Sequence, residues 1–96
     1  MRQRKKIVGT KISPEIKKLY NDIIKTHIVL LHKTNKHSYL FNQIFNDAQV
    51  LELLNLFAKH GFQSTATYIS PIKGTNYNNW LFHIIWEKEK IDFCLE

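Results

Sequence analysis

The apolar positions between residues 47 and 61 recur with the period of an α-helix. The apolar face carries Val50, Leu51, Leu53, Leu54, Phe57 and Ala58, and the polar face carries Gln49, Glu52, Asn55 and Lys59. Such a division at about 100° per residue is typical of an amphipathic helix. Asn46 or Asp47 can accept hydrogen bonds from the first free N–H groups, and Gly61 suits the left-handed position after the last turn. We therefore predict a helix over residues 47–60.

Beyond this helix the apolar period falls from 3.6 to 2. Trp80, Phe82, Ile84 and Trp86 alternate with Leu81, His83, Ile85 and Glu87. The first set therefore shares one wholly apolar face of a strand. Residues 64–72 are rich in Thr, Tyr and Ile, which favour strands, and residues 73–79 are rich in turn formers. We predict two strands joined by a projecting turn, with both tryptophans packed on the helix over residues 47–60.

A second amphipathic helix is predicted over residues 14–32. Ser13, Pro14 and Glu15 are typical of a helix start, because they supply a cap, a proline in the first turn and an acid near the positive dipole end. The apolar face contains Ile16, Leu19, Tyr20, Ile23, Ile24, Ile28, Leu30 and Leu31, with His27 in its middle. Lys17, Lys18, Asn21, Asp22 and Lys25 lie outside this face or at its margin.

Residues 38–45 decide between two folds. Tyr39, Phe41 and Phe45 would share one face of a strand, but periodicity over so short a run also permits a helix. A strand gives an α+β fold ordered helix–strand–helix–strand–strand, with a small antiparallel-type sheet and two helices packed on one face. A helix gives a winged helix, in which residues 47–60 would read DNA. Because the polar face of residues 47–60 has no net charge, we choose the strand.

Length and composition indicate one domain. We expect a basic N-terminal tail over residues 1–12 and a single α+β domain over residues 13–96, since 96 residues suffice for one core. The single Cys94 has no internal disulfide partner, and no apolar run is long enough to span a bilayer, so we expect a cytoplasmic protein without membrane contact. Alternation at Ile91, Phe93 and Leu95 suggests that the last residues extend the sheet or dock on it.

Positive charge is concentrated in the first third of the chain. Residues 1–36 carry a net charge of +8, whereas residues 37–96 carry −2. This clustering suits an anionic partner, nucleic acid first, and a solvated tail that only aids solubility explains it equally well. The candidate binding residues are Arg2, Arg4, Lys5, Lys6, Lys11, Lys17, Lys18 and Lys25, with Lys73 and Tyr77 as hairpin contacts.

Catalytic and metal-binding patterns are weak, and we expect no cofactor. The three glycines are isolated, so no phosphate-binding loop is indicated. His27, His32 and His37 are spaced by five, which does not place them on one helical face, so we expect no metal site. Cys94 has no neighbour in sequence that would activate it as a nucleophile. A ribonuclease alternative would pair His27 with His83 for acid–base chemistry, provided that the two side chains meet.

The succession of a helix, Gly61-Phe62, a strand, a long turn and a strand ending in Ile85-Trp86 resembles small uncharacterised proteins encoded by bacteriophages. The resemblance covers about residues 14–87 and brings no catalytic residues. It implies a setting in which small accessory proteins bind host or defence components.

We therefore expect a non-catalytic protein that binds nucleic acid, or a complex that handles nucleic acid, through its basic first third. The alternative is a protein–protein inhibitor that binds an acidic surface of a host protein, and a small histidine-dependent ribonuclease comes third. A homodimer is a further option, because an exposed sheet face bearing Leu81, His83 and Ile85 would mark a partner or homodimer surface.

Overall fold

The computed structural model describes residues 12–89, 91 and 93–96. Its elements are α1 (Pro14–Ile23), η1 (Ile24–Ile28), α2 (Val29–Lys33), β1 (Ser38–Phe45), α3 (Asp47–Lys59), β2 (Gln63–Pro71) and β3 (Asn78–Ile85). The first three join into one helix, so the predicted order helix–strand–helix–strand–strand is confirmed. The winged-helix alternative is wrong, because residues 38–45 form a strand.

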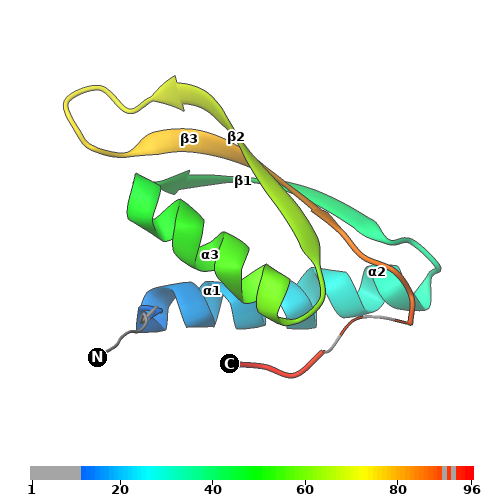
Figure 1. Ribbon diagram of the computed structural model, residues 1–96. Helices are drawn as coiled ribbons and strands as arrows, with labels where there is room; N and C mark the ends of the chain where they lie inside the picture. The colour runs from blue at the N-terminus through cyan, green and yellow to red at the C-terminus, as the bar shows by residue number, and fades with distance from the viewer. Residues whose placement is uncertain (1–11, 90, 92) are drawn as a thin grey trace, which may run out of the picture.

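The three strands form an antiparallel sheet in the order β1-β3-β2. The described helices lie on one side of this sheet, and its other side faces away from them (Figure 1). Phe82 and Ile84 are buried on the helix side, whereas His83 and Ile85 lie on the open side. The period of two therefore predicted the faces of β3 correctly, because the helices cover only one of them.

The joined first helix starts where it was predicted, but the cap differs. Pro14 occupies the first turn, and the Ser13 side chain makes no capping hydrogen bond. The Ser13 N–H instead donates to Glu52 Oε1 at 2.7 Å, which ties the start of α1 to α3. None of the helices in the described part of the chain has the length and apolar composition that a bilayer span requires.

A π-helical turn in the middle of the first helix changes which side chains reach the core. In η1 the main-chain hydrogen bonds span five residues instead of four, so each turn is wider. Each residue then rotates less about the axis, which keeps both Ile24 and Ile28 in the core. His27 is exposed, although its ring stacks on Tyr39, and Leu30 is 60% exposed. The predicted places of His27 and Leu30 on the apolar face are therefore wrong.

The N-terminal end of α3 is held by a reciprocal pair of hydrogen bonds. Asn46 Oδ1 accepts from the Gln49 N–H, and Gln49 Oε1 accepts from the Asn46 N–H, both at 2.9 Å. The predicted apolar face needs correction, because Leu51 is 62% exposed, Ala58 is exposed, and Leu56 is buried. α3 contacts α1 as well as the sheet, so its buried stripe is turned toward the side that carries Leu56.

The C-terminal end of α3 follows the prediction. Gly61 has a φ of 90°, which a residue without a side chain adopts at low cost. The Phe62 N–H donates to the Phe57 carbonyl oxygen at 2.9 Å, and the two rings meet edge to face at 5.6 Å. The chain therefore leaves α3 directly into β2.

Both tryptophans lie on the helix side of the sheet, but they have different partners. Trp86 is buried against Phe62, and its Nε1 donates to His32 Nδ1 of α2 at 3.3 Å. Trp80 is partly buried, and its Nε1 donates to the Phe45 carbonyl oxygen at 3.1 Å. Their hydrogen-bond partners therefore come from α2 and β1. Trp86 also belongs to the hydrophobic core that contains Leu53 and Phe57 of α3, and Trp80 packs against this core.

Phe93 and Glu96, near the end of the chain, contact the helices. The Phe93 ring meets His32 of α2 at 5.0 Å. The main chain of Glu96 exchanges two hydrogen bonds with the Asn21 side chain, at 2.7 and 3.2 Å. The described residues after β3 form no strand, so the prediction that this segment extends the sheet is wrong.

Candidate functional site

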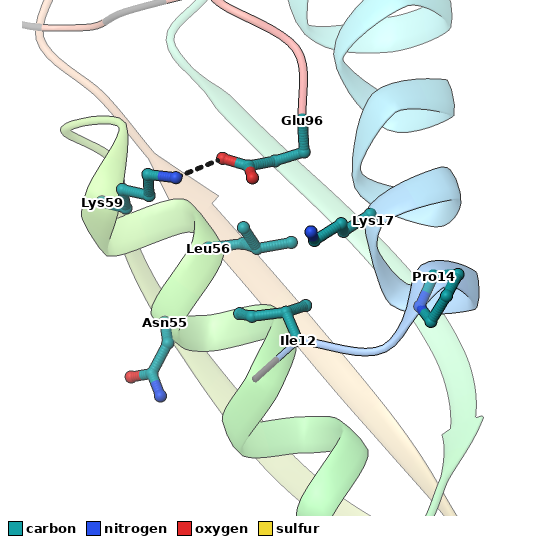
Figure 2. A pocket seen from close by; sticks show the side chains of 7 residues that line it. All are labelled: Ile12, Pro14, Lys17, Asn55, Leu56, Lys59 and Glu96. Carbon is teal, nitrogen blue, oxygen red and sulfur yellow. Dashed lines mark hydrogen bonds and ion pairs between the residues drawn. The ribbon is translucent and has the colours of Figure 1, made fainter. Parts of the chain in front are cut away.

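A groove lies where the start of α1, the C-terminal end of α3 and the end of the chain meet. It is lined by Ile12, Pro14, Lys17, Asn55, Leu56, Lys59 and Glu96 (Figure 2). Ile12 is the first described residue. The groove is therefore also the place where the basic residues 1–11 join the described fold.

Two lysines supply the positive charge of the groove. Lys17 extends from the first turn of α1 toward the space between α1 and α3 (Figure 2). It is exposed and forms no ion pair with any described residue. Lys59, in the last turn of α3, donates to Glu96 Oε2 at 2.9 Å, and its side chain is 63% exposed. An ion pair this exposed stabilises a fold only slightly, so both lysines are accessible to an external anion.

Glu96 is held by a second and less exposed partner. His60 Nε2 lies 2.7 Å from Glu96 Oε2, and the His60 ring is stacked on Tyr20 at 5.1 Å. An ionised carboxylate can only accept, so Nε2 carries the proton in this hydrogen bond. Hydrogen bonds from Lys59 and His60 hold the pKa of Glu96 below its ordinary value of 4.5. Glu96 is therefore an anion that already occupies the cationic end of the groove.

His60 and Glu96 were not predicted as site residues. A histidine at the end of a helix is ordinary, because a cation there suits the helix dipole. Glu96 lies 36 residues away from His60, and no local spacing connects two positions so far apart. The only local signal was the apolar alternation at Ile91 and Phe93, which indicated that the last residues dock on the fold.

The predicted binding residues divide into three groups. Lys17, Lys18 and Lys25 are exposed on the first helix, and Lys17 alone lines the groove. Lys73 and Tyr77 are exposed in the turn between β2 and β3, and neither lines the groove. Arg2, Arg4, Lys5, Lys6 and Lys11 lie outside the described residues. The structure therefore places the three helical lysines on one exposed element and leaves the hairpin residues apart from it.

α3 lacks the surface of a helix that reads DNA. Its charged residues are Asp47, Glu52 and Lys59, a net charge of −1. Lys59 is paired with Glu96, and Glu52 accepts from Ser13. A helix that enters a groove of nucleic acid presents cations to phosphates, so α3 is a packing element.

The two histidines of the ribonuclease alternative lie on opposite sides of the sheet. His27 is stacked at 4.8 Å on Tyr39, which belongs to the helix side of β1. His83 lies on the open side, where Leu40 and Thr65 are its neighbours on the flanking strands. The sheet separates the two imidazoles, so the pair that this alternative requires is not formed.

A second group of histidines gathers at the end of the first helix. The His32 and His37 rings meet at 5.5 Å, and His37 Nε2 is buried without a hydrogen-bond partner among the described residues. Residues 12–89, 91 and 93–96 contain no group of three or more histidine, cysteine or acidic side chains placed to hold a metal ion. The described contacts of these two histidines are with aromatic rings: His37 packs against Trp86, and His32 packs against Phe93.

Comparison of the chain with protein-family models, with curated proteins and with solved structures found no match.

Proposed function

We propose that this protein is a non-catalytic binding protein that engages nucleic acid, or a complex that handles nucleic acid, through its basic first third. The observation that carries the proposal is the segregation of charge, +8 in residues 1–36 against −2 in the remainder. The described cations of this third are Lys17, Lys18, Lys25, Lys33 and Lys36, and all five are exposed. Clustered cations bind a phosphate backbone because the bound counterions are released.

The position of the groove supports the same partner. Lys17 points into it, and the basic residues 1–11 join the fold at Ile12 beside it. Cations of residues 2–11 and of α1 thus follow one another in the sequence, and Lys17 is the one of these that lines the groove. We therefore place the phosphate contacts along residues 2–25, with Lys17 at the centre.

We expect little preference for base sequence. Phosphate contacts position a protein but carry no sequence information. Residues 1–11 contain no aromatic side chain for base stacking, and α3 does not serve as a reading helix. In the bacteriophage setting, the protein would act stoichiometrically on nucleic acid or on a host complex that holds it.

The helical lysines provide the test of the described part of this surface. We expect K17Q/K25Q to weaken binding to a labelled duplex and to reduce the salt slope by about 0.9 for each phosphate that is no longer neutralised. Fluorescence anisotropy between about 50 and 200 mM salt, the range over which such slopes are steep, gives both quantities. The matched control K88Q/K90Q removes two charges outside the first third and should leave the slope unchanged.

Equal losses of affinity in the two double variants would contradict the proposed surface. An acidic peptide of the same charge as the oligonucleotide separates nucleic acid from the inhibitor alternative. If the peptide displaces the oligonucleotide at equal concentration, the surface recognises carboxylates as well as phosphates, and an acidic protein becomes the better partner.

A further inference from the structure

The open side of the sheet carries no Lys, Arg, Asp or Glu among its described residues. Its side chains come from alternate positions of the three strands: Ser38, Leu40, Asn42, Ile44, Gln63, Thr65, Thr67, Ser70, Asn79, Leu81, His83 and Ile85. In a chain with 23% charged residues, a whole face without charge is unusual. Depletion of charged residues is the compositional mark of the centre of a protein interface.

Apolar side chains on this face follow the boundary between β1 and β3. Ile85, Leu40, Leu81 and Ile44 alternate between the two strands along their length. Leu40 is 58% exposed and Ile44 is 55% exposed. The flanking strand β2 instead presents Thr65 and Thr67 at the same level. Large exposed apolar side chains thus occur at both edges: Leu40 and Ile44 lie in the regular ladder of β1, whereas Tyr68 and Ile69 lie at the bulge of β2.

The two edge strands also differ in their backbone. β1 pairs with β3 at eight consecutive positions without a bulge, and it contains neither a proline nor a charge. β2 has a bulge between Tyr68 and Ser70 and ends at Pro71. Bulges, prolines and charges are the features by which edge strands avoid pairing with another chain. β1 lacks all three, and among the described residues β3 is its only strand partner.

We infer that the β1 edge pairs with the β1 edge of a second copy, antiparallel and about a two-fold axis at Asn42. Paired residues must share a face, so the register can shift only in steps of two residues. With the axis at Asn42, Leu40 faces Ile44 of the second copy and the two Asn42 amides face each other. Axes at Phe41 or Gln43 would instead place Leu40 or Ile44 opposite Asn42.

Two observations favour a second copy over nucleic acid at the β1 edge: the lack of charge on this edge and the two-fold symmetry, which limits the assembly to two copies. A nucleic acid needs cations, and this edge offers none. Two copies with net charge +6 meet here without like-charge contacts. The pairing is isologous, so it closes at two copies and leaves the bulged β2 edges outside. With the axis at Asn42, residues 39–45 of each copy pair along about 24 Å. A contact along one strand edge buries less surface area than a standard interface, so we expect a reversible dimer.

Sedimentation velocity of the full chain over a range of concentrations tests the inference. We expect a monomer–dimer equilibrium. Leu40→Lys should raise the dimer dissociation constant by at least about tenfold, because a two-fold interface contains the substituted residue twice. Thr67→Lys adds the same charge to the same face at the β2 edge and should leave the equilibrium unchanged. Leu40 is exposed, so far-UV circular dichroism should show that both variants fold.

Cross-linking tests the register without weakening the fold. In a Cys94→Ser background, Asn42→Cys should give a covalent dimer under glutathione disulfide, because facing residues of paired strands bring their Cβ atoms close together. Thr67→Cys in the same background should remain monomeric. A chain that stays monomeric up to about 1 mM overturns the inference and leaves the β1 edge to a strand of another protein. Equal effects of Leu40→Lys and Thr67→Lys would also overturn it.

Discussion

At the scale of single residues, Glu96 connects parts of the chain that are far apart in sequence. Its carboxylate contacts Lys59 and His60, and its main chain bonds to Asn21 of α1. Its side chain is only 11% exposed, so these hydrogen bonds are partly shielded from water. One residue therefore fixes the end of the chain against both helices.

Replacing Glu96 with glutamine should destabilise the fold in a pH-dependent way. Hydrogen bonds to the charged carboxylate lower its pKa in the folded state below the ordinary value of 4.5. This contribution is complete above the unfolded-state pKa and is lost as the pH falls through the lowered folded-state pKa. We expect Glu96→Gln to reduce the free energy of unfolding by about 1–2 kcal/mol at pH 7. Urea unfolding at several pH values measures this difference.

Glu89→Gln is the matched control for this measurement. Glu89 is an exposed carboxylate in the turn after β3, so its removal should change stability by less than about 0.5 kcal/mol. The difference between the two variants should shrink as the pH falls from 7 to about 3. A difference that stays constant over this range would contradict the assigned hydrogen bonds.

Residues of the candidate site could be predicted only where the local sequence alone indicates a binding role. Among the described residues that were predicted to bind, only Lys17 lines the groove, and it was named because charge and helical position are both properties of the local sequence. The contact between His60 and Glu96 was not identified, because it depends on how the end of the chain returns to the helices. Sequence periodicity contains no information about that return.

At the scale of elements, the first helix shows where a regular period misleads. A period of 3.6 places His27 among the apolar residues, whereas the wider η1 turn buries Ile28 and exposes His27. We expect Ile28→Ala to destabilise the protein by about 2–5 kcal/mol, because it leaves a cavity in the core. His27 is exposed and stacks on Tyr39, so we expect His27→Ala to cost less than Ile28→Ala, at most about 1.5 kcal/mol.

Urea unfolding of the two alanine variants tests the π-helical turn directly. A regular α-helix would bury His27, and its truncation would then cost as much as a core substitution. Comparable losses of stability in His27→Ala and Ile28→Ala would therefore contradict the placement of these side chains.

The elements themselves were largely predictable from sequence. The strand over residues 38–45 was the ambiguous choice, and its aromatic side chains together with the lack of net charge on the polar face of residues 47–60 decided it correctly. The helix stop at Gly61 and Phe62 was also predicted, because it depends on neighbouring residues alone. The exposure of Leu51 and burial of Leu56 were not predicted, since α3 packs on α1 and on the sheet at once.

At the scale of the whole molecule, the two proposed surfaces lie on different sides. The first helix, which carries Lys17, Lys18 and Lys25, lies on one side of the sheet (Figure 1), whereas the face without charge is the other side. A continuous sheet formed by two copies would keep both first helices on one side of it. The dimer would then present two basic surfaces to one strand of nucleic acid, which raises the apparent affinity.

The central claim is that the basic first third binds a phosphate backbone. The most direct test compares the salt dependence of duplex binding by the full chain and by a chain lacking residues 2–6. This deletion removes Arg2, Arg4, Lys5 and Lys6. We predict that the slope of log affinity against log salt falls in magnitude by up to about 3.6, or about 0.9 for each cation removed. Unchanged affinity and slope would show that this segment does not bind nucleic acid, and would contradict the claim.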